Sequence, residues 1–255
     1  HYEDLGKKLN IRVSFTDKYN EEETHFLTCN NPYFQMIQKA INKDITIRKE
    51  FDLNEHDKKQ VKDFDTLDHI YKNLQIYKKK NSLHDFNDII KSVINSDKIP
   101  KFKAIFIDEA QDLSPLQWQL YDKLKEHCDQ IYLAGDDDQA IYAWAGADVK
   151  RFVQEPAKER ILRQSRRISM SVQAEARYPI TRIQGIRKRK HYLPRDYDGE
   201  SHYIADLNQV DLTKGKWLIL TRTKSNLLDI MKDLRRKNFY YQSNKGKSFK
   251  VGMYE

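Results

Sequence analysis

A short apolar stretch that ends in two neighbouring carboxylates limits most strongly what this chain can fold into. Residues 102–107 read Phe-Lys-Ala-Ile-Phe-Ile, and Asp108 and Glu109 follow directly. A brief apolar run bounded by polar residues is typical of a strand buried in a parallel sheet. Parallel strands need a long crossover between them, usually a helix. The pattern therefore predicts an α/β fold with functional groups at the carboxyl ends of its strands.

The rest of the sequence fits this class. Up to about residue 100, apolar residues recur every three or four positions, which predicts a mostly helical region. Beyond residue 101, short apolar runs alternate with amphipathic stretches. The expected strands are Ile131–Ala134, Ile161–Leu162 and Trp217–Thr221, with another starting at Phe239–Tyr241, and the expected helices are Leu116–His127, residues 168–183 and Leu227–Leu234.

Composition excludes several other classes of protein. With 39% hydrophobic and 11% aromatic residues, the chain is too apolar to be disordered. Its longest purely apolar run, Ala140–Ala145, is far shorter than the roughly 18 residues of a membrane span. Cys29 and Cys128 are too few for a disulfide scaffold or a cysteine-rich zinc site, and they fit a reducing compartment. Because no basic-then-apolar leader opens the sequence, we expect a cytoplasmic globular protein.

Positive charge is concentrated in residues 157–195, called the basic segment below. The segment holds twelve basic residues against Glu159 and Glu175, although the whole chain carries a formal charge of only +8. Such a stretch attracts polyanions, and nucleic acid is the first candidate. A solvated basic face without a ligand is the alternative, and charge alone leaves both open. The basic residues are Lys158, Arg160, Arg163, Arg166, Arg167, Arg177, Arg182, Arg187, Lys188, Arg189, Lys190 and Arg195.

Asp108 and Glu109 have the chemistry that a nucleotide hydrolase needs. One carboxylate can hold the Mg²⁺ that bridges the phosphates, and its neighbour can orient or deprotonate the attacking water. The alternative is an ordinary helix start, where acidic side chains favour the positive end of the helix dipole. The pair alone does not decide between the two.

A second polar segment follows the strand expected at residues 131–134. Residues 135–148 read Gly-Asp-Asp-Asp-Gln-Ala-Ile-Tyr-Ala-Trp-Ala-Gly-Ala-Asp. With the Asp-Glu-Ala-Gln-Asp of residues 108–112, they resemble motifs II and III of the UvrD/Rep/PcrA family of superfamily 1 DNA helicases. Residues 83–90 and 217–223 resemble segments that this family places before motifs II and V, and residues 162–168 resemble motif IV. The resemblance covers about residues 80–240.

The resemblance implies a fold and a division of the chain. The fold would consist of RecA-like, parallel-sheet motor domains of the P-loop NTPase type, with an inserted helical subdomain and with both ends truncated. We expect residues 1–82 to form the helical subdomain inserted in the first motor domain. Residues 83–157 would be the C-terminal part of that RecA-like domain, and residues 158–255 the N-terminal part of the second.

The resemblance also assigns catalytic roles. Asp108 would coordinate Mg²⁺, and Glu109 would be the catalytic base. Gln139 would sense the γ-phosphate of ATP, and Arg167 would reach the same phosphate as an arginine finger. Arg166 replaces the tyrosine that usually stacks on adenine, and its guanidinium plane can stack on a base as well.

Other residues would bind DNA or support the site. Tyr142 and Trp144 would lie along the single-strand track, where bases stack on aromatic rings; packing in a core is the alternative for these rings. The arginines that many relatives carry beside this tryptophan are alanines here, at positions 143 and 145. For Gln111 and Asp112 we expect a supporting hydrogen-bond role. Arg222 is either a phosphate contact or a surface residue.

A phosphate-binding loop of the form G-x-x-x-x-G-K-[ST] does not occur in the sequence. The nearest match, Gly246, Lys247 and Ser248, has Tyr241 in place of the first glycine. That loop supplies the backbone N–H groups and the lysine that hold the β- and γ-phosphates. The chain thus resembles the middle of a helicase, and we expect it not to hydrolyse ATP alone.

The sequence therefore predicts part of an ATP-dependent DNA helicase. Its cofactors would be ATP and Mg²⁺, its partners single-stranded DNA and duplex/single-strand junctions, and its setting DNA repair or replication. One alternative is a non-catalytic nucleic-acid-binding remnant, and another is the helicase part of a helicase–nuclease complex. A metal-dependent nuclease built on the acidic residues does not explain the aromatic residues of motif III.

Overall fold

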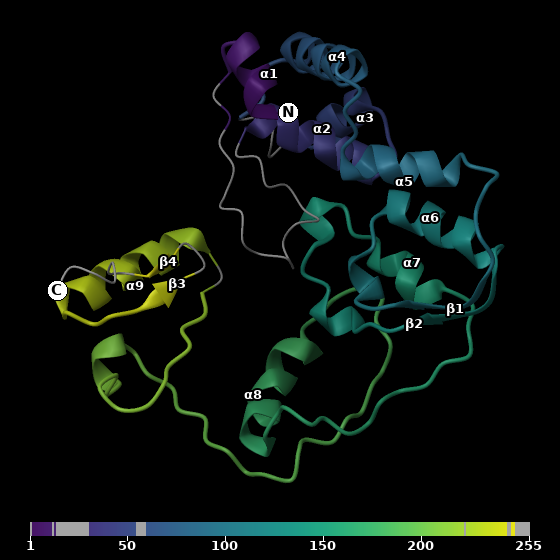
Figure 1. Ribbon diagram of the computed structural model, residues 1–255. Helices are drawn as coiled ribbons and strands as arrows, with labels where there is room; N and C mark the ends of the chain where they lie inside the picture. The colour runs from purple at the N-terminus through teal and green to yellow at the C-terminus, as the bar shows by residue number, and fades with distance from the viewer. Residues whose placement is uncertain are drawn as a thin grey trace, which may run out of the picture. The chain divides into compact units, whose positions relative to one another are not determined.

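The computed structural model describes residues 2–11, 13, 31–54, 60–221, 223–243 and 246–247. They fall into two compact units, one ending at residue 199 and the other beginning at residue 200. The first unit carries helices α1 to α8 and strands β1 and β2, and the second carries α9, β3 and β4 (Figure 1). None of the described helices is long and apolar enough to cross a membrane.

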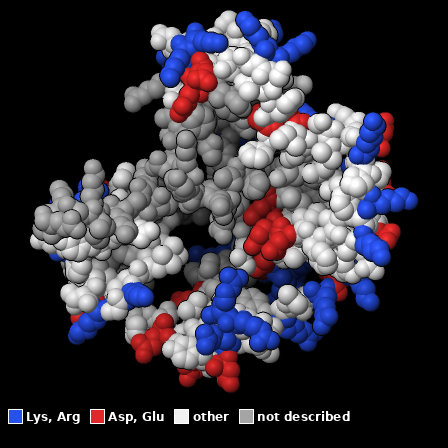
Figure 2. Space-filling view, viewed as in Figure 1, with Lys and Arg blue, Asp and Glu red and all other residues white. Residues whose placement is uncertain are grey.

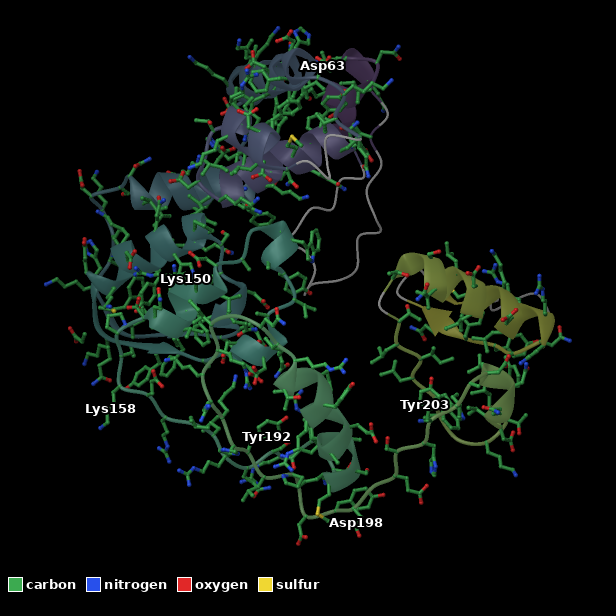
Figure 3. The ribbon with its side chains drawn as sticks, turned by 180° about the vertical axis from the view of Figure 1, so that it is seen from behind. Asp63, Lys150, Lys158, Tyr192, Asp198 and Tyr203 are labelled. Carbon is green, nitrogen blue, oxygen red and sulfur yellow. The ribbon has the colours of Figure 1, made fainter. Side chains whose placement is uncertain are left out.

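The first part of the chain is helical, as its sequence predicts. Its helices are α1 (Tyr2–Lys8), α2 (Pro32–Asn42), α3 (Ile47–Leu53), α4 (Phe64–Lys80) and α5 (Phe86–Ile94). Helices α2 to α5 each begin after a side chain that accepts a backbone N–H bond and so caps the helix; Asp63, the cap of α4, is labelled in Figure 3. Apolar residues of α1, α2 and α4, with Val61 just before α4, form a buried core of Leu5, Phe34, Met36, Ile37, Val61, Leu67, Ile70 and Leu74.

A parallel βαβ unit follows. Strand β1 (Phe102–Ile107) leads through helix α6 (Pro115–Lys125) to strand β2 (Cys128–Leu133), and the two strands pair in parallel, with Phe102 opposite Cys128 and Ile107 opposite Leu133. This confirms the predicted class, a mixed fold with a small parallel sheet. The expected burial of the first strand is wrong, because β1 is exposed or half-buried along its whole length. Helix α6 packs against α5 and buries Leu116, Trp118 and Tyr121. Helix α7 (Val149–Gln154) comes next.

Two predicted strands are not formed. Residues 161–162 and 217–221 belong to no strand of the part that the structure describes, where Gln164 and Leu193 form the only bridge between residues 155 and 221. A strand is stable only with a partner that takes up its backbone groups, and here no neighbouring strand does so. Leu162 and Leu218 are accordingly 83% and 82% exposed. Apolar sequence in these stretches was therefore a wrong indicator of sheet.

The predicted helices between and after these stretches are present. They are α8 (Met170–Thr181) and α9 (Lys224–Arg236). The last strand, expected from residue 239, begins slightly later as β3 (Gln242–Ser243), which pairs antiparallel with β4 (Gly246–Lys247). Cys128 is a free thiol. Cys29, Arg222 and Ser248 lie outside the described residues.

Candidate active site

The segments after β1 and β2 are joined by a continuation of the strand ladder. The backbone N–H of Ala134 donates to the carbonyl of Ile107 at 2.8 Å, and that of Ala110 donates to Ala134 at 2.9 Å. Parallel strands bring their carboxyl ends to one edge of the sheet. Residues 108–112 and 135–139 consequently lie side by side, as the sequence predicts for two polar segments after neighbouring strands.

The carboxylate pair sits at this edge, exposed to solvent. The backbone N–H of Glu109 donates to Asp108 Oδ1 at 2.9 Å. Glu109 itself has φ 51° and ψ 39°, in the left-handed region, and a 3₁₀ turn (Ala110–Asp112) follows it. A non-glycine residue in such a conformation carries strain of about 1–3 kcal/mol, and strained residues concentrate at functional sites.

Gln111 connects the two segments through its side-chain amide. Its Nε2 donates to Glu109 Oε2 at 2.7 Å and to Asp112 Oδ2 at 3.2 Å, and its Oε1 accepts the backbone N–H of Asp136 at 2.9 Å. The residue is only 1% exposed. The supporting hydrogen-bond role expected for Gln111 is thus confirmed: one side chain fixes the candidate base and the start of the second segment together.

Asp112 is half-buried and accepts a hydrogen bond from Gln111. Burial raises the pKa of its carboxyl, the negative charge of Glu109 raises it further, and the hydrogen bond from Gln111 opposes both. Within the described part of the chain, Asp112 Oδ1 has no hydrogen-bond partner. The carboxyl of Asp112 is therefore more easily protonated than an ordinary aspartate, which limits the negative charge beside Glu109.

The three aspartates of the second segment, Asp136–Asp138, are called the acidic triplet. Arg187 donates to both carboxylate oxygens of Asp138 at 2.7 Å, and Lys190 Nζ forms ion pairs with all three aspartates. The backbone N–H of Lys188 donates to Asp137 Oδ2 at 2.7 Å. Sequence reasoning missed these partners, although an acidic run and the Arg-Lys-Arg-Lys run of residues 187–190 are complementary.

The ion pairs shift the titration of both sides. Hydrogen bonds from Arg187 lower the pKa of Asp138. Burial alone would raise the pKa of Asp136, but hydrogen bonds from Lys190 and Gln139 outweigh it and hold this pKa below its usual value. Burial would likewise lower the pKa of Lys190, whereas the hydrogen bonds to Asp136 and Asp137 raise it. Asp136 and Asp138 are therefore kept ionised.

Gln139 and the two aromatic residues stand next to the triplet in the chain. Gln139 is exposed, and its Nε2 donates to Asp136 Oδ2 at 2.7 Å. Trp144 lies in a 3₁₀ turn (Ala143–Ala145) and is 58% exposed, with its ring centroid 6.4 Å from that of Tyr142. Asn42 at the end of α2 donates to the carbonyl of Ala145 at 3.5 Å, so helix α2 supports the turn.

The basic segment is mostly unpaired. Figure 2 shows an acidic patch beside a cluster of basic side chains, and Figure 3 labels two residues of the segment, Lys158 and Tyr192. Nine of its twelve basic residues form no ion pair with a described carboxylate; the exceptions are Arg187, Lys188 and Lys190. Arg166 and Arg167 are exposed, and within the described part of the chain neither guanidinium forms a hydrogen bond or an ion pair with Asp108, Glu109 or Gln139.

The carboxylates fit a magnesium ion held mainly by other ligands. In the described part of the chain, no cluster of three or more His, Cys, Asp or Glu side chains could hold a metal. Mg²⁺ in nucleotide sites typically takes one or two carboxylates and otherwise binds phosphates and water. Asp108, an exposed hard-oxygen ligand at a strand end, suits that arrangement.

Comparison with known proteins gives a consistent result. The family model of the UvrD/REP helicase N-terminal domain matches residues 3–159. The chain is 30% identical over 118 residues to the ATP-dependent DNA helicase PcrA of Staphylococcus epidermidis, which is 42% of this chain and 16% of that protein. It is 36% identical over 89 residues to PcrA of Bacillus subtilis, 31% of this chain and 12% of the relative. The chain thus matches less than a fifth of the length of these relatives.

Proposed function

The chain belongs to the UvrD/REP helicase family, and on that premise we propose that it forms part of a motor that couples hydrolysis of Mg-ATP to movement on single-stranded DNA and to duplex unwinding. The observation that carries this proposal is the Gln111 bridge. It joins Glu109, the candidate base, to the segment that leads to Gln139 and the aromatic turn. A nucleotide site and a DNA site that share a hydrogen-bonded framework can be coupled.

The fold of the motor is part of the proposal. The parallel β1–α6–β2 unit belongs to a RecA-like domain, with residues 83–157 as the C-terminal part of the first such domain. Residues 1–82 are its inserted helical subdomain, and residues 158–255 begin the second. The helical region and the parallel pair support this division.

Each residue of the nucleotide site then has a distinct task. Asp108 would hold Mg²⁺, which would supply positive charge to the phosphates of the nucleotide. Glu109 orients the attacking water and accepts its proton. Gln139 senses the γ-phosphate from its place beside Asp136.

The arginines and the aromatic rings complete the cycle. Arg167 meets the developing phosphate charge when the motor closes, and Arg166 stacks on the base of the nucleotide. Tyr142 and Trp144 stack on bases of single-stranded DNA, where each base contributes about 1–3 kcal/mol independently of sequence. The exposure of Trp144 supports this role. Alternation between tight and weak DNA binding moves the strand, because ATP binds the two states differently.

The chain by itself does not turn over ATP, since no phosphate-binding glycine–lysine loop occurs in its 255 residues. We place the complete motor in the cytoplasm and in DNA repair or replication, at single-strand and junction structures.

Two measurements test the proposal. Binding of an oligo-dT strand by the purified chain is measured by fluorescence anisotropy, with Trp144→Ala as the variant and Trp217→Ala as a matched loss of an exposed indole. We expect only Trp144→Ala to weaken binding, and equal binding by both variants would contradict the DNA role. ATP turnover is measured with and without the oligonucleotide. DNA-stimulated turnover that disappears in Glu109→Gln would overturn the expected inactivity of the chain.

A further inference from the structure

The ion pairs around the acidic triplet are more extensive than a surface contact needs. Asp138 and Lys190 expose only 7% and 15% of their side chains, and Arg187 exposes 24%. Arg187 binds Asp138 in a two-pronged geometry, in which both oxygens accept. Such planar pairs fix orientation as well as distance.

These contacts reach the candidate sensor in two steps. Lys190 Nζ binds Asp136 Oδ1, and the other oxygen of the same carboxylate, Oδ2, accepts the side-chain amide of Gln139 at 2.7 Å. The backbone N–H of Asp138 also donates to Asp136 Oδ1, at 3.2 Å, and that of Gln139 to the Asp136 carbonyl at 2.9 Å. The orientation of the Asp136 carboxylate therefore decides where the Gln139 amide points.

We propose that Lys190 and Arg187 are positioning residues that orient Gln139 through the acidic triplet. Lys190 holds the Asp136 carboxylate, and Arg187 holds Asp138, so that the loop between β2 and the aromatic turn keeps one conformation. This inference rests on the proposed function for the meaning of Gln139 as a sensor. The contacts from residues 187–190 make the basic segment part of the site as well as a charged surface.

Lys188 provides a matched control within the same run. Its ammonium pairs with Glu159 outside the triplet, and only its backbone N–H reaches Asp137. Lys188→Met thus removes one positive charge from the same segment and leaves the backbone contact intact. Lys190→Met removes the same charge together with the contact to Asp136.

The test follows the Gln139 side chain directly. The chain is labelled with ¹⁵N-glutamine, and the side-chain amide signals of Gln139 are assigned by their loss in Gln139→Ala. We expect Lys190→Met to shift these signals, Lys188→Met to leave them in place, and Lys190→Arg to keep them close to their native positions. Unchanged Gln139 signals in a folded Lys190→Met protein would overturn the inference.

Substitutions of Arg187 decide the case in which Lys190→Met does not fold. Arg187→Met removes one partner of Asp138, and Arg187→Lys keeps a positive charge at the same position. We expect displaced Gln139 signals in Arg187→Met and signals closer to their native positions in Arg187→Lys. Equal signals in both would count against a positioning role.

The proposed function and this inference fail differently. The spectra of the Gln139 amide are recorded without DNA. A native chain that binds no oligo-dT would therefore contradict the proposed DNA binding and leave the positioning role unaffected. Binding of oligo-dT by the two variants is compared at one salt concentration. If only the lost positive charge mattered, Lys190→Met and Lys188→Met would weaken this binding equally. We expect a larger loss for Lys190→Met, because Tyr142 and Trp144 lie shortly after Gln139 in the same loop.

Discussion

Gly135 allows the two polar segments to approach each other closely, because it has no side chain. A Cβ at this position would lie 2.5 Å from Gln111 Oε1, 2.9 Å from Phe152 Cζ and 3.2 Å from the backbone nitrogen of Ala110. The restriction is one of space, because two different parts of the chain, residues 110–111 and Phe152, approach Gly135. The Gln111 bridge therefore depends on a glycine after β2.

We expect Gly135→Ala to lower the free energy of unfolding by about 1–3 kcal/mol, the usual range for overpacking a filled site. Urea denaturation of the purified chain measures the change. In a Gln111→Ala background the closest obstacle is absent, so the same substitution should be less destabilising there. Strictly additive effects of the two substitutions would show that Gln111 is not the obstacle.

For single residues, the sequence predicts well where the side chains that follow a strand lie. It predicts poorly which residues far along the chain interact with them. The placement of Asp108 and Glu109 follows from the local apolar run before them. The hydrogen-bonding role of Gln111 follows from the motif that contains this residue. The partners Arg187 and Lys190 lie about fifty residues beyond the triplet, and no local pattern selects them from twelve basic residues. The catalytic and binding roles of all the candidate site residues, Arg166 and Arg167 included, stay predictions.

Among the elements, α6 and the end of α7 are joined by one buried carboxylate. Glu155, whose side chain is 2% exposed, accepts from the Tyr121 hydroxyl at 2.8 Å and from Lys125 at 2.8 Å, and lies 3.1 Å from Arg151. Burial would raise the pKa of Glu155, but the hydrogen bonds from Lys125 and Tyr121 outweigh it and lower the pKa below 4.5. The ionised form is therefore the one that stabilises the fold.

We expect Glu155→Gln to destabilise the chain by about 1.5–3 kcal/mol at neutral pH, because hydrogen bonds to a charged group are lost. A lowered pKa in the folded state means that the unfolded state binds the proton first, so the native advantage is present above pH 4.5 and fades as pH falls through the folded pKa. Denaturation curves of both proteins should thus converge in acid. As a control, Asp229→Asn breaks an exposed ion pair on α9 and should change the stability by only about 0–1 kcal/mol. If the stability of the native chain and that of Glu155→Gln changed with pH in parallel, ionised Glu155 would not be the group that stabilises the fold.

The junction of α4 and α5 depends on Asp85 in two ways. Asp85 caps α5 by accepting the N–H of Asp88 at 3.0 Å, and it binds Lys78 of α4 at 2.8 Å. We expect Asp85→Ala to lower the stability by about 1–2 kcal/mol through loss of the cap. Asp85→Asn retains a capping oxygen and loses only charge, so thermal unfolding should place it between the native chain and Asp85→Ala. An Asn variant as unstable as the Ala variant would exclude the cap as the cause.

Elements with a local signature were predictable from sequence, and elements that need a distant partner were not. Helices α6, α8 and α9 follow from apolar spacing, and β1 follows from a mostly apolar run. Residues 161–162 and 217–221 have similar composition, yet the described chain offers them no strand to pair with. Sheet formation is a property of two segments, so one segment alone does not reveal it.

For the whole molecule, the unpaired part of the basic segment governs attraction to nucleic acid. Binding of single strands releases counterions, so the logarithm of the binding constant falls with the logarithm of salt concentration by about 0.7 per phosphate contact. We expect a steep salt dependence for oligo-dT binding, and a shallower one in the double variant Arg160→Gln/Arg163→Gln, whose residues form no described ion pair. Anisotropy titrations at several salt concentrations measure the slope. A slope near zero in the native chain would exclude phosphate contacts.

The family was predictable from two motifs, and the match over residues 3–159 confirms it. The boundaries at residues 82 and 157 stay predictions, because a boundary depends on which parts pack together and the motifs carry no such information. The order of the motifs along the chain thus identifies the family more readily than it identifies the domain boundaries.

The ladder that continues from β1 and β2 into Ala110 and Ala134 has a consequence for the evolution of this chain. An inserted or deleted residue within 102–111 or 128–136 would shift the register and turn the following side chains to the opposite face of the sheet. Gln111 would then point away from Asp136. Residues 96–100, which precede β1 and carry no ladder bond, can gain or lose residues without moving the site. Natural length variation is therefore expected ahead of the sheet and not along it.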